Sequence, residues 1–379
     1  MTMISPPPAP PAAQHTLVPL GHESLVAIIG PGMAKVAVRA VNEFRRRPGW
    51  TREQTIHPRD LLGFEDVGEF LEAFSYLCYA QGATPDQARD EANWLGQHLC
   101  YYLNFELHHR KTFWVDEPLA WMLGQTRLDI EGRALKLPFP SFAVAFTDRA
   151  TCARAEHLMA RDRERRQPGP VQSLTAYLTR LPEEGEGLGL NVSLLADQRD
   201  GHWPYFVSRD LFVRPDDDLD TLLDSHFPEV QAESLDPFFR SDELKRLVHL
   251  VVNAVLYATS YSDTWPVLAS PVKELRKSAN GKGEKRRQRV EQKVLELAKT
   301  NSAEDVFHLP GNIPISQLQA LREMERSDSG RQLLARFMVR GHWRRAAESW
   351  TDQRLRWIEP YWKGPEMATV IEREYQLKP

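Results

Sequence analysis

The stretch DELKRLVHLVVNAVLYAT, residues 242–259, is apolar on nearly every side. A helix of that composition is buried in a core rather than laid on a surface. Upstream of it, segments rich in β-branched and aromatic residues approach the period-two alternation of strands; these are 137–149, 171–181, 188–201 and 203–213. We therefore expect residues 242–259 to form a helix packed against an antiparallel sheet of three or four strands.

The first third of the chain has a different pattern. Segments 34–47 and 65–80 repeat apolar residues at the i, i+3, i+4, i+7 spacing of amphipathic helices. A third helix is expected to begin after Thr84, because Thr84 is a favourable N-cap and Pro85 suits the first helical position. The predicted fold class is α+β, with a helical N-terminal half and, in the C-terminal half, an antiparallel sheet with packed helices.

Composition divides the chain into three parts. Residues 1–16 contain the run PPPAPP and predict a disordered or polyproline tail. Residues 17–134 are expected to form a mainly helical region, and 135–379 an α+β region. No apolar run is long enough for a membrane span, and the start lacks the pattern of a secretory signal. We therefore expect a cytoplasmic protein that does not contact membranes.

The α+β region is expected to end in a basic and aromatic β-hairpin, VRGHWRRAAESWTDQRLRWIEPYWKGP at 339–365. Strand alternation places Trp343 on one face of a first strand and Trp357 on one face of a second. The opposite faces are expected to carry Arg340, His342, Arg344, Arg356 and Ile358. A connection around 346–353 joins the two strands, and the tryptophan face is expected to pack on helix 242–259.

Two basic segments are candidates for contact with a partner. The segment 273–299 has ten Lys or Arg against four Glu, a density that suits phosphate contacts. In the hairpin, guanidinium groups on indole faces form cation–π contacts worth about 0.5–2 kcal/mol, and this pairing also stacks RNA bases or anchors protein interfaces. The predicted partner- or RNA-binding residues are Lys285, Arg286, Arg287, Arg289, Arg340, His342, Trp343, Arg344, Arg354, Arg356, Trp357, Tyr361, Trp362 and Lys363.

Other roles for these segments remain open. In the first segment, glutamates among the basic residues can pair with them and give an ordinary solvated helix face. In the hairpin, arginines can pack over tryptophan simply to seal the fold. A third alternative is catalysis, with His342 as general base and Arg340 and Arg344 steadying an anion.

Motifs that would indicate a cofactor or a metal do not occur. The glycine-containing stretches at 30–35 and 280–285 fail the P-loop template. His108 and His109 would point about 100° apart on a helix, so they are expected to end a helix rather than to hold one ion. The aspartates at 216–220 lack the glycine and distal glutamate of a calcium loop and predict a solvated linker. We expect no cofactor and no metal.

At GHWRR and RLRWIEPYWKGP the sequence resembles the type V-A anti-CRISPR family whose founding member lowers the level of the CRISPR effector nuclease by acting on its synthesis. Proteins of that family end in a His-Trp-rich strand, a variable connector, and a basic-aromatic strand followed by Gly. Here these are 340–344, 345–353 and 354–364. The hydrophobic helix at 247–261 and the segment at 137–146 are similar as well.

The resemblance implies a regulator that recognises the N-terminal segment of the nascent effector and causes loss of its messenger. No catalytic residue is carried over from the family, so we expect binding rather than catalysis and do not predict a nuclease. The implied partners are a nascent polypeptide or protein target, with mRNA or the ribosome as further partners. Two rival hypotheses remain, an RNA-processing enzyme that uses His342 and the nearby arginines, and a non-catalytic interaction scaffold. Neither the target nor the oligomeric state follows from the sequence.

Overall fold

The computed structural model describes residues 31–51, 53–57, 60–61, 64–80, 82, 84–160, 169–181, 186–198, 205–227, 242–261, 267–269, 286, 289–290, 305–309, 337–339, 341–346, 351 and 353–363. Several sequence expectations lie outside these residues. They are the Pro-rich tail at 1–16 and the side chains of Lys285, Arg287 and Arg340.

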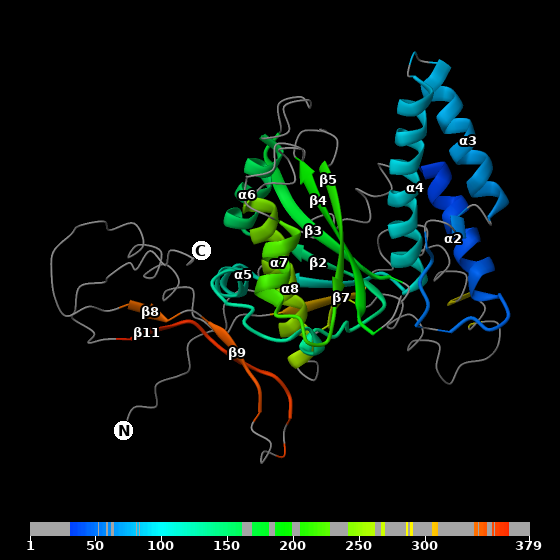
Figure 1. Cartoon of the computed structure of the whole chain (residues 1–379). Helices are drawn as coiled ribbons and strands as arrows, with labels where there is room; N and C mark the ends of the chain where they lie inside the picture. Colours follow the sequence, from blue (N-terminus) through cyan, green and yellow to red (C-terminus); the bar gives the residue numbers. More distant parts are fainter. Residues whose placement is uncertain are drawn as a thin grey trace, which may run out of the picture.

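Among the described residues, seven strands form one mixed sheet in the order β5-β4-β3-β2-β1-β7-β6 (Figure 1). The strands are β1 Lys111–Val115, β2 Ser141–Phe146, β3 Val171–Arg180, β4 Leu188–Gln198, β5 Tyr205–Val213, β6 Val267–Ala269 and β7 Asp305–Leu309. Strands β2 to β5 form the expected antiparallel meander. Strand β1 runs parallel to both β2 and β7, so the sheet is wider and more mixed than the sequence pattern predicted.

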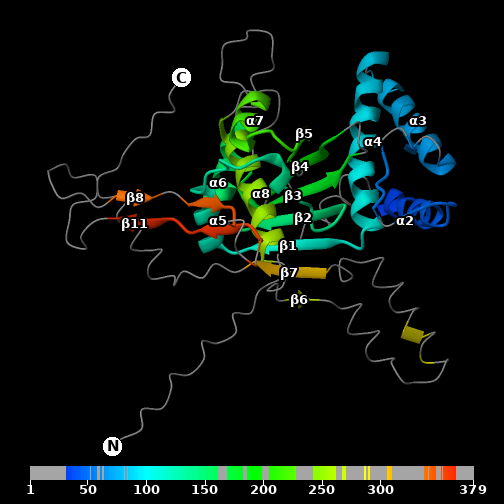
Figure 2. The same cartoon turned by 60° about the horizontal axis from the view of Figure 1, so that its bottom comes forward.

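Helix α8 (Asp242–Ser260) confirms the buried helix predicted from 242–259. With α5 (Glu117–Gly124), α6 (Arg149–Ala160) and α7 (Leu219–His226), it covers one face of the sheet (Figures 1 and 2). Leu247, Val251 and Ala254 of α8 are fully buried in a core cluster that also contains alternate residues of β2. Each buried Leu or Val side chain contributes about 1.5–3 kcal/mol, which makes α8 the main support of this layer.

Three helices occupy the other side of the sheet: α2 (Pro31–Arg45), α3 (Glu65–Ala80) and α4 (Pro85–Leu107). The start of α4 is a capping box, as Thr84 predicted. The Thr84 hydroxyl accepts from the Gln87 amide at 3.2 Å, and the Gln87 side chain accepts from the Thr84 amide at 2.9 Å. Helix α4 buries its apolar side against Ala143, Tyr177 and Leu195 of the sheet. No helix among the described residues is long and apolar enough to cross a membrane.

A buried asparagine fixes the segment after α2 onto α4. The Asn104 side chain accepts from the Ile56 amide at 2.7 Å and donates to the Ile56 carbonyl at 2.8 Å. Both partners are buried, so neither backbone group has water as an alternative. This double hydrogen bond sets the path of residues 51–57 between the helical region and the sheet.

The C-terminal end of α4 is stabilised from two directions. The Arg45 guanidinium donates to the carbonyls of Glu106 and Leu107, at 3.1 and 2.6 Å. His108 ends the helix, as expected, but it is buried, and its Nε2–H donates to the Gln54 carbonyl at 3.1 Å. Burial lowers the pKa of His108 to about 4, because the charged ring would lose its hydration.

We predict that His108 makes the protein less stable in acid. The unfolded chain binds a proton at His108 near the ordinary histidine pKa of 6.5, whereas the folded chain does so only near pH 4. The neutral His108 ring therefore contributes fully to the free energy of unfolding above pH 6.5. This contribution falls as the pH drops from 6.5 to 4 and is lost by pH 4. The loss is on the order of 3 kcal/mol, at about 1.4 kcal/mol per pKa unit.

Urea unfolding of wild type and His108→Gln at pH 7.5, 6, 5 and 4 tests this expectation. The glutamine amide keeps a hydrogen-bond donor at position 108 but does not titrate. The difference in unfolding free energy between wild type and variant should shrink with falling pH. His157→Gln, at an exposed position on α6, is the control and should follow the wild-type profile. A pH-independent difference for His108→Gln would contradict the prediction.

Candidate functional site, a basic ribbon on two buried tryptophans

The C-terminal segment forms the predicted hairpin, in two paired sections. Strands β9 (His342–Arg344) and β10 (Arg356–Ile358) pair antiparallel, and so do β8 (Phe337–Val339) and β11 (Tyr361–Lys363). The same register runs through both sections, since Trp343 faces Trp357 and Val339 faces Tyr361. We call β9 and β10 together the ribbon. It lies beside α5 and α8 (Figures 1 and 2).

The inner face of the ribbon is formed by two buried indoles. Trp343 and Trp357 are 5% and 7% exposed, and their ring centroids lie 6.4 Å apart. Tyr257 of α8 meets Trp357 edge to face at 5.3 Å. The sequence expectation that the tryptophan face packs on helix 242–259 is therefore confirmed. The expectation that these two rings contact a partner is corrected, because their faces are enclosed by the core.

Both indole N–H groups have buried acceptors that the sequence did not reveal. Trp343 Nε1 donates to the Asn253 side chain of α8 at 2.8 Å, and Trp357 Nε1 donates to the Thr126 hydroxyl at 3.1 Å. Asn253 in turn donates to the carbonyls of Leu123 and Thr126, both at 3.2 Å. One buried network thus joins the ribbon, α8 and the end of α5.

A glycine brings the ribbon close to the segment after α5. Gly341 pairs with Thr126, and its carbonyl accepts from the Arg127 amide at 2.9 Å. A Cβ at position 341 would lie 2.6 Å from the Thr126 hydroxyl and 3.0 Å from Pro360 Cδ. A side chain therefore does not fit at this point, where the two sections of the hairpin meet.

The outer face of the ribbon is basic. Arg344 and Arg356 are direct cross-strand partners, and both are exposed. His342 pairs with Ile358 on the same face, and exposed Arg354 follows at the end of the connection. This is the face that strand alternation predicted. Two arginines directly opposite each other concentrate positive charge at one place on the ribbon.

An ion pair fixes the far end of β9. Arg345 Nη2 lies 2.6 Å from Glu131 Oε2, and Arg133 Nε lies 2.6 Å from the same oxygen. The Arg345 guanidinium, with Arg133 beside it, lowers the pKa of the Glu131 carboxyl. The chain that follows β9 is therefore held to the segment after α5 by charge as well as by the Gly341 backbone.

The other predicted site residues are distributed as follows. Arg286 and Arg289 are exposed on a short helical piece. In both views the short piece coloured for these residues lies on the side of the helical region, away from the ribbon (Figures 1 and 2). For Tyr361, Trp362 and Lys363 the structure describes the backbone of β11 alone.

The acidic linker has structural roles. Asp218 is the N-cap of α7 and accepts from the Thr221 amide at 2.9 Å, and Asp217 accepts from the Arg214 amide at 2.7 Å. Asp216 pairs with Arg133. Among the residues that the structure describes, no group of three or more His, Cys, Asp or Glu is placed to hold a metal ion.

A family model described as "AcrVA2-like: Anti-CRISPR type V subtype A2 family" matches residues 113–365, more than half of the 379-residue chain. The chain belongs to the AcrVA2-like family. The match begins in β1, includes α8, and ends just after β11, so the family segment contains both the sheet and the ribbon. The resemblance noted at the C-terminal strands is thereby confirmed.

Two other comparisons concern whole chains. A solved structure described as "Crystal structure of AcrVA2" aligns with a TM-score of 0.47 at 11% identity, over 90% of this AcrVA2-like chain and 96% of the other. No curated protein sequence matches.

We predict that the Asn253 network stabilises the ribbon. Asn253→Leu leaves the Trp343 indole N–H without its acceptor and the Thr126 carbonyl without the Asn253 donor, at roughly 1–3 kcal/mol for each, whereas the Leu123 carbonyl keeps the Thr126 amide at 3.1 Å. The expected loss of unfolding free energy is about 2–4 kcal/mol, measured by urea denaturation. Arg246→Leu, at an exposed position on the same helix, is the control and should change stability by less than about 0.5 kcal/mol. Equal stability of the two variants would contradict the assignment.

Proposed function

We propose that this AcrVA2-like chain lowers the amount of a CRISPR effector nuclease by engaging the effector's nascent chain, its messenger, or both during translation. Membership of an anti-CRISPR family supports the general role. The observation that carries the contact with RNA is the outward pair Arg344 and Arg356, placed directly opposite each other on an exposed face.

The geometry of this pair suits an anion. Each guanidinium presents a planar set of donors that matches a phosphate or carboxylate with two hydrogen bonds. An anion that lies between the two side chains can contact both guanidinium groups at once. The phosphates of a single-stranded messenger supply such anions in series, and His342 and Arg354 extend the same face.

The buried face of the ribbon keeps Arg344 and Arg356 opposite each other before any binding partner is present. A two-stranded hairpin is marginally stable in water by itself. Here Trp343 and Trp357 attach it to α8 and to Thr126 through packing and hydrogen bonds. The outer arginines are therefore presented on a supported backbone, which reduces the entropy lost on binding.

We predict that Arg344→Gln/Arg356→Gln loses RNA affinity while it stays folded, because both side chains are exposed. Its affinity for a single-stranded fragment of the effector messenger should fall at least about 10-fold at low salt. The slope of log affinity against log salt should become shallower by about 1.4, because each of two phosphates bound on a single strand contributes about 0.7 to that slope. Arg39→Gln/Arg89→Gln, exposed on α2 and α4, makes the same charge change and should leave both quantities unchanged.

In bacterial cells that express the effector, the ribbon variant should also restore effector protein and messenger, whereas the control variant should still lower them. A pull-down from a translating extract, with and without nuclease, separates the two contacts. Recovery of the nascent effector after nuclease treatment assigns it a direct protein contact. Absence of ribosomes, messenger and nascent chain from the wild-type pull-down would refute the proposed function.

A further inference from the structure

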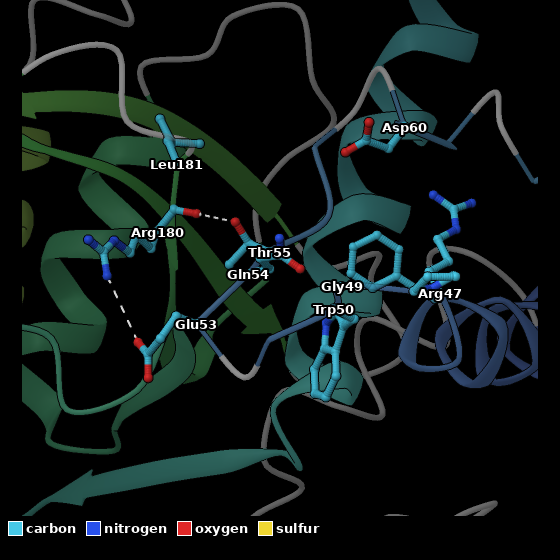
Figure 3. A pocket seen from close by; sticks show the side chains of 11 residues that line it. Arg47, Gly49, Trp50, Glu53, Gln54, Thr55, Asp60, Arg180 and Leu181 are labelled. Carbon is cyan, nitrogen blue, oxygen red and sulfur yellow. Dashed lines mark hydrogen bonds and ion pairs between the residues drawn. The ribbon is translucent and has the colours of Figure 1, made fainter.

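A groove lies between the helical region and the sheet, on the side opposite the ribbon. It consists of two pockets of about 560 and 720 Å³ that share Trp50, Glu53 and Arg180. Figure 3 shows the smaller pocket, between the segment after α2 and the end of β3. The Arg180–Glu53 pair, 3.9 Å apart, and the hydrogen bond from the Thr55 hydroxyl to the Arg180 carbonyl at 2.6 Å connect its two walls.

Aromatic and proline side chains line much of the groove. Phe44, Pro48 and Trp50 belong to the wall formed by the helical region. The opposite wall, which precedes β2, carries Pro138, Phe139 and Pro140. Such rigid apolar faces suit a ligand that is itself rigid and apolar, because little conformational freedom is lost by either side on binding.

Trp50 supplies an unused hydrogen-bond donor. Its ring is half-buried and lines both pockets, and its Nε1 is inaccessible to water and has no acceptor among the described residues. A buried donor without an acceptor costs roughly 1–3 kcal/mol. A rotation of the half-buried ring would turn this N–H toward the groove, where a ligand carbonyl oxygen could accept from it and recover that free energy.

Helix α4 ends beside the second pocket in a left-handed C-cap, in which the His109 and Arg110 amides donate to the carbonyls of Glu106 and Phe105 at 3.1 and 2.8 Å. His109 and Arg110 follow α4 with φ angles of 66° and 47°, in the left-handed region that non-glycine residues rarely adopt. His109 lines the pocket.

We propose that the groove binds a polyproline II segment and that its occupant is the chain's own PPPAPP run at residues 6–11. A polyproline II helix has no internal hydrogen bonds, so its carbonyls are free to accept from an indole N–H. Proline-rich segments bind in aromatic-lined grooves in this way. PPPAPP supplies five prolines that can pack on the aromatic and proline walls.

The connection between the run and the groove has a suitable length. Helix α2 has 15 residues and begins at Pro31, so the groove at its far end lies roughly 20–30 Å from Pro31. The intervening residues 12–30, treated as a random coil, span about 22–26 Å on average. A connection that matches its span gives an effective concentration on the order of 1 mM, which fills a site of about 0.1 mM affinity to roughly nine-tenths.

The test uses the full-length chain and a labelled peptide, ISPPPAPPAA, which copies residues 4–13. In one variant, the five prolines at 6, 7, 8, 10 and 11 are replaced by serine. The chain keeps its length, but its own N-terminal run should no longer occupy the groove. Fluorescence anisotropy should show that this variant binds the peptide about 10-fold more tightly than wild type, because wild type already holds its own run.

Trp50→Phe in the proline-to-serine background should weaken peptide binding about 3- to 12-fold, the effect of losing one hydrogen bond while the ring is kept. Trp121→Phe, a partly buried tryptophan on α5, is the matched control and should leave binding unchanged. Hydrogen exchange provides a second measurement that does not require a substitution at Trp50. The Trp50 indole proton should exchange with solvent more slowly in wild type than in the proline-to-serine variant.

Two results would overturn the proposal. Failure of the proline-to-serine variant to bind the peptide would show that the groove is not a polyproline site. Equal binding by wild type and by that variant would show that the groove accepts such a segment from another molecule while the chain's own run stays outside it.

Discussion

The arrangement of the C-terminal region depends on one buried polar contact, the hydrogen bond from the Trp343 indole to Asn253. Asn253 lies in the buried stretch of α8 between Val252 and Ala254, and its amide bonds to Trp343 and to the carbonyls of Leu123 and Thr126. Removing any member would leave buried donors or acceptors unpaired, so the network admits one position of the ribbon relative to α8. Apolar packing alone would tolerate sliding of two flat indoles; the directional bonds do not.

This constraint gives the two faces of the ribbon separate roles. Strand alternation assigns Trp343 and Trp357 inward and Arg344 and Arg356 outward, and the inward pair fixes the outward pair at cross-strand distance. Indole and guanidinium groups that are adjacent in sequence therefore lie on opposite faces, with the rings in the core and the cations at the surface. A partner of the ribbon meets charge and hydrogen-bond donors rather than aromatic faces.

Helix positions and the faces of strands could be predicted from the sequence, whereas contacts between residues far apart in the chain could not. Period-two alternation correctly separated the faces of the hairpin, and the apolar stretch at 242–259 correctly indicated α8. Strand β1 was missed because five residues, 111–115, follow directly on a long helix, and its parallel pairing requires β7, nearly 200 residues later. Thr126 was missed for the same reason, since a threonine after a short helix has no local sign that it will accept from Trp357. The groove at Trp50 combines segments from α2, α4 and β3, which no single pattern connects.

The net charge of the whole chain bears on how a basic ribbon can be selective. The chain carries 48 Lys and Arg against 52 Asp and Glu, so positive charge on the ribbon is balanced by acidic surface elsewhere. Acidic side chains on the rest of the surface repel nucleic acid, and screening confines the attraction of the ribbon to about 8–10 Å at physiological salt. The proposed contact with RNA would then be favoured only where the ribbon itself reaches the phosphates. A second contact, such as a nascent peptide, would hold the ribbon at one messenger among many, because two weak linked sites bind far more tightly than either does alone.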